Sequence, residues 1–590
     1  MRKPIYYFLS ILCVLYSCYS MLGCTPERPL KTCNTFDELA DPSVDTLYDW
    51  KDISMGLHAS FVSIDKRYPK SILPEITKTS SVQLTGWKGE RISAQFLVWS
   101  GENKKQLECE LSDFVSASST LSADIGQTYF VRYVMTDEFA GGCGYRKPED
   151  FAASLSPDML DNIECIDLPG KTVRPVWVTV SIPESAQAGI YKGKIVVYAD
   201  RKKAHELEVE LKIQDKVLPP AAKWEYYLDL WQHPSAVART QNLELWSEAH
   251  FEAMKPLFKM LADAGQKVIT TTLNKDPWNN QCYDRYEDMI VWSKNEDGSW
   301  TYDYTIFDKW VSFMMQEVGI NKTINCYSMV PWNNELHYKD MASGEIVNVK
   351  ADPGTKVFEE IWPPFLTDFV KHLKEKGWLE ITNIAMDERS PQAMDATISL
   401  LQRVAPDLGI SLADNHKSYK RYPFIREMTV GAEAKVDEED IKMRREKGLI
   451  TNYYVCCSHQ FPNVFTFSDP AEAVYSAWYA KAAGYDGYLR WAYNSWVENP
   501  LTDSRFRTWP AGDTYIVYPD ARSSIRFERL IEGIQDVEKI RILEEEFEAN
   551  DKESLDKLNN MLDKFNTINL SIPCSEMLKE GKAVIEKLSE

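Results

Sequence analysis

Two adjacent acids, Asp387 and Glu388, follow the mostly apolar run "ITNIAM" at residues 381–386. Two carboxyl groups can divide the roles of acid and base in the hydrolysis of a bond. Successive side chains of a strand point to opposite faces, so both acids can serve one site only if the backbone leaves the strand there. Asp-Glu pairs also occur at 37–38, 137–138 and 437–438, and the pair at 137–138 competes because it too follows an apolar run.

Aromatic, amide and imidazole side chains gather at the ends of the other apolar runs in this part of the chain. Rings stack on the apolar faces of sugars, while amides and acids bind hydroxyl groups, so the set is typical of a polyol-binding pocket. Of the neighbours Tyr453 and Tyr454, one must point away from such a pocket. The candidate binding residues are His233, Trp332, Asn333, Asn415, Tyr454, His459, Trp491, Asn494 and Trp496, and the same strand ends also carry Trp231, Trp278 and Asp414.

Other catalytic signatures are absent from the sequence. It contains no phosphate-binding loop, no dinucleotide fingerprint in a strand-helix context, no GxSxG and no HExxH. Cys456-Cys457 near His459 raises the alternative of a thiol nucleophile, but nothing obvious in the sequence lowers a thiol pKa there. Hydrolysis by carboxylates is the economical interpretation that remains, and we expect neither a cofactor nor a metal.

The adjacency of Asp387 and Glu388 indicates the kind of hydrolysis. Ordinary glycosidases place two carboxylates on opposite sides of the scissile bond, about 5–5.5 Å apart for retention and about 6.5–9.5 Å for inversion. Neighbouring residues suit a substrate-assisted route better, in which the 2-acetamido oxygen of the sugar attacks the anomeric carbon. One carboxyl then protonates the leaving oxygen while the other accepts the acetamido N–H, and a close pair tends to separate the two pKa values as this requires.

After the proline-containing boundary "VLPPAA" at 217–222, eight short apolar runs alternate with helical patterns. Such alternation is typical of βαβ units, and eight of them predict a (β/α)8 barrel over residues 219–522 with its active site at the carboxyl ends of the strands. The predicted strands are 226–231, 267–273, 324–330, 381–386, 409–414, 427–432, 450–455 and 487–492.

Helical periodicity fills most of the intervals between these strands. In the third helix, Phe365, Phe369 and Leu373 belong to one apolar stripe and Gly377 suits the carboxyl-terminal cap. The insertions at about 274–304 and 331–360 exceed ordinary connections, so we expect them to form site loops. The predicted helices are 244–265, 307–319, 363–377, 391–404 and 470–484.

The flanking regions have different patterns. Residues 46–218 alternate apolar and polar residues in short runs separated by turns, which predicts an all-β sandwich. Residues 523–590 are charged and helical and predict a C-terminal helical region. The chain is therefore predicted to be multidomain, with an N-terminal all-β sandwich, a central (β/α)8 TIM-like barrel and a C-terminal helical segment.

The N-terminus carries export signals. Arg2 and Lys3 precede an apolar run too short to span a bilayer, which predicts a signal peptide over 1–23. "MLGC" resembles a bacterial lipobox, so we expect lipidation of Cys24, a tether over 24–45 and a place in the bacterial cell envelope. The alternative is ordinary cleavage without a lipid. "CTPERP" has no acidic run after the cysteine, so we prefer a periplasm-facing anchor to surface display.

The amino-acid composition indicates which kinds of molecule the protein binds. The net charge of −21 disfavours nucleic acid, because an acidic surface repels phosphates. The 18 Trp and 30 Tyr fit carbohydrate binding, although large aromatic cores would explain them too. The other cysteines are scattered without CxxC or Cys/His clusters, so we expect neither a zinc site nor a disulfide framework, and Cys143 with Cys165 is the one pair that we would test for a disulfide.

Four motifs resemble those of glycoside hydrolase family 123, the β-N-acetylgalactosaminidases: "NIAMDE", "NYYVCCSH", "GYDGYLRWAYNSW" and "GDTYIVYPD…SSIRFERLIEGIQDVE". The resemblance covers the barrel and the C-terminal helices and reaches the sandwich through "RPVWVTVSIPESAQAGIYKGKIVV". It implies Asp387 as the residue that orients the acetamido group and Glu388 as general acid/base. Tyr454 would bind the acetamido oxygen, and Trp491, Asn494 and Trp496 would line the sugar subsite. The sequence departs from the family at Arg490, where we expect an aromatic residue.

The resemblance implies a retaining, exo-acting enzyme for terminal β-linked N-acetylgalactosamine (GalNAc), as found on glycosphingolipid glycans. Two alternatives stay open. A β-N-acetylglucosaminidase would use the same chemistry on a sugar that differs at the 4-hydroxyl. A lipid-anchored glycan-binding protein would keep the pocket without catalysis, although the intact pair of acids counts against it. We expect contact with a membrane only through the lipid anchor, and the sequence leaves the oligomeric state undetermined.

Overall fold

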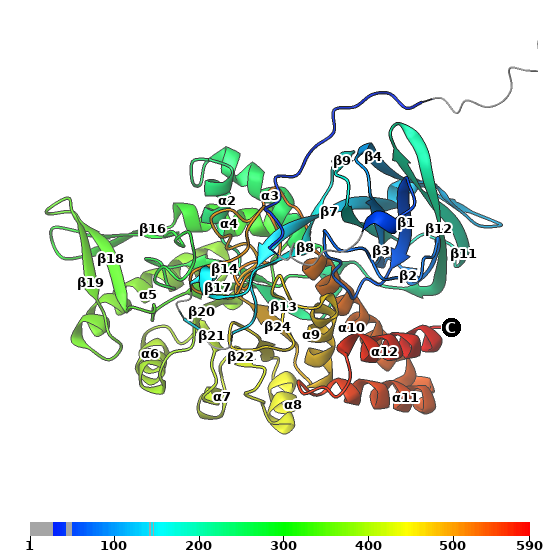
Figure 1. Ribbon diagram of the computed structural model, residues 1–590. Coiled ribbons are helices and arrows are strands. Elements are labelled where there is room, and N and C mark those ends of the chain that lie inside the picture. Colours follow the sequence, from blue (N-terminus) through cyan, green and yellow to red (C-terminus); the bar gives the residue numbers. More distant parts are fainter. Residues whose placement is uncertain (1–26, 43–49, 141–142, 145–146) are drawn as a thin grey trace, which may run out of the picture.

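The computed structural model describes residues 27–42, 50–140, 143–144 and 147–590. The predicted signal peptide and the lipidation site at Cys24 lie outside these residues. Figure 1 shows N-terminal sheets on one side, a barrel on the other and C-terminal helices below the sheets. Within the described residues, no helix is both long enough and apolar enough to cross a membrane.

The N-terminal region consists of two antiparallel-rich sheets around one core. Phe96 and Val176 from one sheet and Ile195 and Leu211 from the other belong to the same cluster of buried residues. In sheet order, one sheet contains β1 (Leu57–Val62), β3 (Arg91–Ser100), β10 (Thr172–Ser181), β7 (Gly126–Thr136) and β8 (Ser154–Asp161). The other contains β2 (Ser81–Lys88), β12 (Lys202–Val217), β11 (Gly189–Ala199), β4 (Lys104–Leu111) and β9 (Ile166–Leu168), with the short β5 (Phe114–Val115) and β6 (Thr120–Leu121) beside it.

Residues 27–42 lie against these sheets, which corrects the prediction of a tether for this part of 24–45. Cys33 forms a disulfide with Cys165. Glu38 is buried, and its carboxylate lies 2.6 Å from Arg174 and 2.6 Å from Lys70. Although burial alone would raise it, these two cations lower the pKa of Glu38 to about 2. A buried arginine needs such a partner, and the segment supplies it.

The disulfides differ from the pair that the sequence singled out. Cys143 and Cys165 do not bond to each other; Cys165 bonds to Cys33, and Cys143 bonds to Cys457 with 314 residues between them. The prediction was wrong because pairing depends on which strand ends the fold brings together, and sequence spacing does not contain that information.

The central sheet has eight parallel strands, and all eight predicted strands are confirmed. It nearly closes into a barrel, because the Lys267 N–H donates to the Leu228 carbonyl at 3.0 Å between the two strands at the ends of the order. In sheet order the strands are β13 (Tyr227–Leu230), β24 (Gly487–Arg490), β23 (Ile450–Tyr454), β22 (Glu427–Gly431), β21 (Gly409–Ala413), β20 (Thr382–Met386), β17 (Thr323–Tyr327) and β14 (Val268–Thr272).

Helices fall on all five predicted segments. In α5 (Lys356–Lys376) the predicted stripe of Phe365, Phe369 and Leu373 is buried, and Gly377 caps the helix in the left-handed region with φ of 73°. The other four are α3 (Glu248–Ala262), α4 (Thr305–Phe313) with a π-helical extension (Met314–Val318), α6 (Pro391–Val404) and α9 (Pro470–Ala482). Three helices that were not predicted are short or carry almost no apolar stripe: α2 (Pro234–Thr240), α7 (Ser418–Arg421) and α8 (Glu438–Glu446).

The two long insertions form a small sheet of their own beside the barrel. Its order is β16 (Trp300–Asp303), β15 (Val291–Lys294), β18 (Glu335–Asp340) and β19 (Ile346–Lys350). This sheet pairs strands from both insertions, since β15 lies in the first and β18 in the second. The insertions therefore support each other through this shared sheet.

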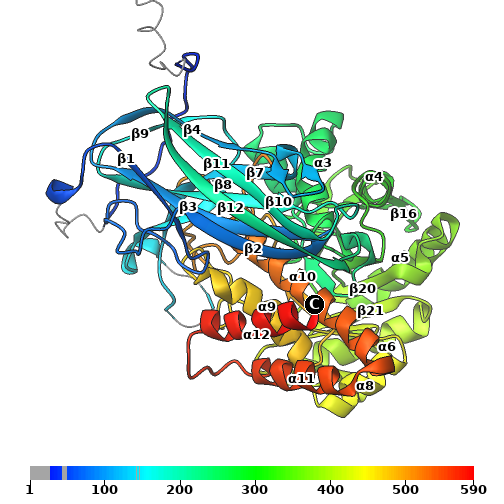
Figure 2. The same cartoon turned by 90° about the vertical axis from the view of Figure 1, so that its right-hand side faces the viewer.

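The C-terminal helices α10 (Ile525–Asn550), α11 (Lys552–Leu562) and α12 (Cys574–Leu588) fill the space below the N-terminal sheets (Figures 1 and 2). The side chain of Lys539 in α10 lies 2.7 Å from that of Glu90 in the sheet region. On the barrel side, the Trp478 indole of α9 donates to Asp536 of α10 at 3.2 Å. The helix α10 thus joins the sheets to the barrel. Short 3-10 helices occur at Trp50–Asp52, Ala123–Ile125, Pro148–Asp150, Ala221–Lys223, Leu379–Ile381 and Asp563–Phe565.

Candidate active site

Asp387 and Glu388 lie where the chain turns from strand into helix at the barrel mouth. β20 ends at Met386, and α6 begins at Pro391 with the side chain of Ser390 as its cap. The backbone N–H of Glu388 donates to Asp387 Oδ1 at 3.0 Å, which fixes the first carboxylate at the turn. Both acids line one pocket, so the backbone does leave strand geometry between them.

The Asp387 carboxylate is held by donors on two sides. The Trp332 indole donates to Oδ2 at 3.0 Å, opposite the backbone donor on Oδ1. Burial raises the pKa of Asp387, while these two donors favour the ionised form. The guanidinium of Arg389 lies 5.1 Å from the centre of the Trp332 ring and donates to Asn334 at 3.0 Å, which keeps that indole in place.

Glu388 has a different environment. Its side chain remains open to solvent at the pocket mouth, yet the surrounding protein desolvates it and raises its pKa to about 7, with further contributions from the negative charges of Asp387 and Asp414. A carboxyl with a pKa near neutrality can donate a proton and later take one back. The pair thus combines one carboxylate stabilised by N–H donors with one carboxyl suited to acid/base work.

Tyr454, the last residue of β23, reaches Glu388 across the pocket. Its hydroxyl donates to Glu388 Oε1 and accepts from the Asn415 amide at 2.9 Å. The Asn415 carbonyl oxygen in turn accepts the Gly431 N–H at 2.8 Å. The neighbour Tyr453 points the other way and donates to the Ser476 carbonyl at 2.6 Å, as strand alternation predicts.

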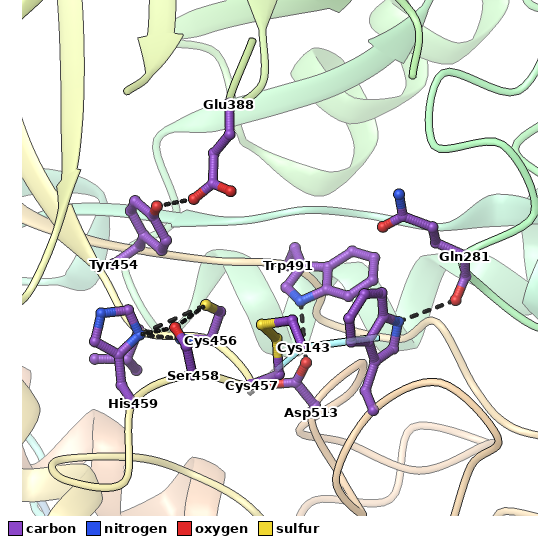
Figure 3. The surroundings of a disulfide bond; sticks show 12 residues. Cys143, Gln281, Glu388, Tyr454, Cys456, Cys457, Ser458, His459, Trp491 and Asp513 are labelled. Carbon is purple, nitrogen blue, oxygen red and sulfur yellow. Dashed lines mark hydrogen bonds between the residues drawn. A yellow bond between two sulfur atoms is a disulfide. The ribbon is translucent and has the colours of Figure 1, made fainter. Parts of the chain in front are cut away.

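The pocket at this mouth is small, with a cavity volume of about 300 Å³, and five of its fifteen lining residues are aromatic. Trp231 forms part of a buried cluster at its base, with its ring 5.0 Å from Trp278 and 4.7 Å from Tyr327 between centroids. Figure 3 shows Glu388, Tyr454 and Trp491 around the opening, together with a disulfide bond. The lining residues are Cys143, Gly144, Trp231, Gln281, Trp332, Asp387, Glu388, Ala413, Tyr454, Val455, Cys456, Cys457, Leu489, Trp491 and Trp509.

Two family models match the chain. The glycoside hydrolase 123 catalytic domain matches residues 231–543, and the glycoside hydrolase 123 N-terminal domain matches residues 61–199. The chain belongs to glycoside hydrolase family 123. Both acids and most of the pocket lining lie inside the matched catalytic domain, and the match makes the protein a glycoside hydrolase.

A solved structure agrees with this family. A family 123 glycoside hydrolase from Clostridium perfringens, studied for glycolipid glycan hydrolysis, is 25% identical with a TM-score of 0.82, covering 90% of this chain and 97% of that one. A putative glycoside hydrolase from Bacteroides vulgatus is 8% identical with a TM-score of 0.30, over 78% of each chain, too low to support an argument. None of the curated proteins compared with the chain matches it.

Three predicted sugar-binding residues of this family 123 hydrolase lie behind the pocket and not in it. His233 is buried, stacks on Tyr286 at 3.6 Å and binds Ser495 through Nδ1 at 2.8 Å. Asn494 exchanges two hydrogen bonds of 2.9 Å with the backbone of His233. Trp496 is buried and donates to a backbone carbonyl at 2.7 Å. Their polar groups are used by the protein, which corrects their prediction as sugar ligands.

Three further predicted residues lie near the pocket without lining it. Asn415 holds Tyr454, as described above. His459 is buried with its ring edge-on to Tyr454 at 6.0 Å, and its Nδ1 accepts the Cys456 N–H at 3.1 Å. The Asn333 side chain binds Asn279 at 3.2 Å within the insertions. Asn415 and His459 support a pocket residue, and Asn333 supports the loop that carries Trp332.

Trp491 lines the pocket as predicted, and Arg490 explains its position. Arg490 is fully buried and pairs with Asp513 at 2.9 Å. The other oxygen of Asp513 accepts the Trp491 indole N–H at 3.2 Å. Trp509 packs edge-to-face on Trp491 at 5.3 Å, and its indole donates to the Gln281 carbonyl at 3.1 Å. Arg490 therefore anchors the aromatic wall from below and does not contact the cavity.

Four lining residues lie away from the predicted strand ends and were not predicted to line the pocket: Gln281 in the first insertion, Trp509 beyond the last strand, and Cys143 and Gly144 from the N-terminal region. None ends a barrel strand, so the rule that located the other candidates does not apply to them. The length of the first insertion was the one signal for Gln281. Nothing in the sequence indicated that residues 143–144 line the pocket.

The cysteines at the pocket offer no nucleophile. Among the described residues, the Sγ atoms of Cys143, Cys456 and Cys457 form one group of metal-binding type, all within 4.8 Å of one another. The Cys143–Cys457 bond occupies two of them, so the group does not present three thiolates. Burial raises the pKa of Cys456 to about 11, which keeps it a protonated thiol at neutral pH.

Proposed function

We propose that the protein removes terminal β-linked GalNAc by retaining, substrate-assisted hydrolysis. The observation that carries this proposal is that Asp387 and Glu388, adjacent in the chain, both open into one small pocket. Two carboxylates on opposite sides of a scissile bond require separate strand ends, and this pair comes from a single turn. A pocket of about 300 Å³ suits a single terminal sugar and hence exo-action.

In this mechanism the substrate provides the nucleophile. The acetamido oxygen attacks the anomeric carbon while Glu388 gives its proton to the glycosidic oxygen, so the glycosidic bond breaks and the aglycone leaves as an alcohol. Asp387 accepts the acetamido N–H and stabilises the positive charge of the oxazolinium ion. Glu388, now ionised, takes a proton from water as that water attacks the anomeric carbon, which restores the acetamido group with net retention.

The donors around each acid support these roles. Asp387 must stay ionised to stabilise the cation, and it already accepts two N–H groups. Glu388 must carry a proton at the start, and its raised pKa of about 7 provides one near neutral pH. Tyr454 is placed to bind the acetamido oxygen once substrate displaces its bond to Glu388.

The natural substrate that we propose is a glycolipid glycan ending in β-GalNAc. The Clostridium perfringens relative supports the glycolipid part, since its structural analysis concerned glycolipid glycan hydrolysis. The motif resemblance supports the sugar. A β-N-acetylglucosaminidase would have the same acid pair, and a test on both sugars separates the two.

The deciding experiment is a panel of aryl β-glycosides with and without the 2-acetamido group. We expect turnover of the β-GalNAc glycoside, little turnover of β-galactoside, and strong inhibition by a GalNAc-derived thiazoline that mimics the oxazoline. Equal rates on β-GalNAc and β-galactoside would refute substrate assistance. A preference for β-N-acetylglucosaminide would keep the mechanism and change the sugar.

We also propose that the enzyme is a lipoprotein of the bacterial envelope, anchored at Cys24 and facing the periplasm. Its two disulfides support an oxidising compartment. Labelling cells with a clickable palmitate should mark the wild type and leave Cys24→Ser unlabelled. Labelling of that variant would place the lipid elsewhere.

A further inference from the structure

The Cys143–Cys457 disulfide joins two domains at the edge of the active-site pocket. Cys143 lies in the connection between β7 and β8 of the N-terminal sheets, and Cys457 lies three residues after the end of β23 in the barrel. Cys143 and Gly144 both line the pocket that contains Asp387 and Glu388. Part of the pocket wall therefore belongs to the N-terminal region.

The barrel side of this bond is already well fixed. The Cys456 carbonyl accepts the Asn463 amide at 3.0 Å, and that amide also donates to the His459 carbonyl at 2.6 Å. Arg490 donates to the Asn463 side chain at 2.8 Å. Because these bonds hold the loop after β23, the disulfide is not needed to place Tyr454, and its effect is on the residues that it attaches to the loop.

The N-terminal side rests on the barrel through the end of β7. The Met135 N–H donates to the Thr502 carbonyl, and the Ser504 N–H donates to the Met135 carbonyl, both at 2.8 Å. Asp137 Oδ1 accepts the Ala511 N–H at 3.0 Å. These contacts bring β7 beside the segment that carries Trp509, and the disulfide then attaches Cys143 directly at the pocket.

We propose that the Cys143–Cys457 disulfide is a substrate-positioning element: it holds Cys143 and Gly144 as a wall that encloses the terminal sugar. Figure 3 shows the bond with Glu388, Tyr454 and Trp491 at the pocket. A cavity of about 300 Å³ lies at the small end of ligand pockets, so losing one wall leaves much of a bound sugar in water. We expect the loss to fall on the binding of the sugar, because the bonds that hold Asp387 and Tyr454 involve neither cysteine. This inference rests on the proposed glycosidase function.

The chain contains a matched control. Cys33–Cys165 is also a disulfide that closes a long loop, with 132 residues between its cysteines, and neither cysteine lines the pocket. Both bonds restrict the unfolded chain and so contribute to stability by the same mechanism. Only the first should influence substrate binding. The double variants C143S/C457S and C33S/C165S therefore separate a pocket effect from a stability effect.

The test uses the full chain and the aryl glycoside that the wild type hydrolyses best. For C143S/C457S we expect KM to rise about tenfold, the equivalent of ~1.4 kcal/mol of binding, with kcat within about twofold. For C33S/C165S we expect both constants to stay at the wild-type values. Thermal unfolding recorded beside the kinetics should show both variants folded at the assay temperature.

Dithiothreitol gives a second measurement that needs no substitution at the pocket. Added to C33S/C165S, it reduces the Cys143–Cys457 disulfide to two thiols and is itself oxidised to its cyclic disulfide. KM should rise as the free thiols of residues 143 and 457 appear in mass spectra. An unchanged KM in both measurements, or an equal rise in the control, would overturn the inference. An inactive wild type would instead refute the proposed function, so the two failures are distinguishable.

Discussion

Asp-Glu pairs end two strands of the molecule, one in each main domain. Asp387-Glu388 follows β20 of the barrel, and Asp137-Glu138 follows β7 of the N-terminal sheets. In both pairs the aspartate is the less exposed residue and the glutamate is open to solvent. Asp137 accepts the Ala511 N–H at 3.0 Å and Glu138 accepts the Ala152 N–H at 3.1 Å, so each serves a backbone group. Around the other pair, aromatic walls enclose a cavity.

The difference lies in the surroundings and not in the motif. Where strands of a barrel converge, side chains from several strand ends face one space, and the desolvation there raises the pKa of Glu388 to about 7. The end of β7 instead packs on loops of the neighbouring domain, since Thr136 binds Thr466 and Asp137 accepts the Ala511 N–H. Substitutions at Asp387-Glu388 should therefore lower activity, and substitutions at Asp137-Glu138 should lower stability instead.

The largest effect should come from Glu388→Gln. An amide cannot protonate the leaving oxygen, so kcat/KM on an aryl β-GalNAc should fall by about 10²–10⁴. The matched variant Glu138→Gln should keep wild-type kinetics. Near-wild-type turnover by Glu388→Gln would refute the catalytic role of Glu388, and both Asp-Glu pairs would then be structural.

Asp387→Asn should follow closely. The amide keeps the size of the side chain and removes the charge that stabilises the oxazolinium ion, a loss of about 10²–10³ in kcat. The inhibition constant for the GalNAc thiazoline should rise as well, because that inhibitor presents the same partner to residue 387. A variant that retains both rate and thiazoline affinity would exclude the orienting role.

Tyr454→Phe should have a smaller effect, about tenfold to a hundredfold in kcat/KM, as expected for one hydrogen bond to a charged group. The alkaline limb of its pH profile should also move to higher pH, since the lost O–H stabilised the ionised Glu388. Asn415→Ala serves as the comparison, because it removes the group that orients the hydroxyl and keeps the hydroxyl itself. A larger loss in Asn415→Ala than in Tyr454→Phe would contradict this order of roles.

Sequence reasoning predicted the barrel strands and the acid pair because both depend on local pattern. Short apolar runs at regular intervals identify parallel strands, and a parallel barrel places its site at their carboxyl ends. The same logic placed Trp332, Tyr454 and Trp491 at the pocket. The same logic wrongly predicted His233 and Asn494 as sugar ligands. Both follow strand ends but turn inward and bind each other, and that orientation depends on packing around the strand ends.

Several residues of the pocket walls could not be predicted from local sequence patterns. Gln281, Trp509 and Gly144 arrive from an insertion, a long loop and another domain, and no sequence period links these segments. The disulfide partners show the same limit, since Cys143 and Cys457 are 314 residues apart. The tether prediction was wrong over 27–42 for a related reason: ion pairs of Glu38 with Arg174 and Lys70 and one disulfide hold the segment, which has no apolar pattern.

The pH profile should reflect the raised pKa of Glu388. Its acid form is needed for catalysis, so kcat/KM should fall about tenfold per pH unit above pH 7. An acid limb should appear where Asp387, whose pKa burial raises, takes up a proton. The folded state holds this proton more tightly than the unfolded state, whose pKa is about 4.3. The stability that Glu388 contributes is therefore complete below that value and is lost as pH rises to about 7. A profile with no alkaline limb near pH 7 would contradict the assignment of Glu388.

Asp137→Asn should have only a small effect on activity, and it tests the comparison at the N-terminal pair. The carboxylate is buried and accepts a backbone N–H from the loop that carries Trp509, so replacing it by an amide weakens a charged hydrogen bond and should lower the unfolding free energy by about 1–2 kcal/mol. KM and kcat should stay within about threefold of wild type, since Ala511 does not line the pocket. Thermal unfolding and steady-state kinetics on the same preparation check both parts. A large loss of kcat without a loss of stability would indicate a catalytic role for Asp137. The barrel surroundings would then not explain the difference between Asp137-Glu138 and Asp387-Glu388.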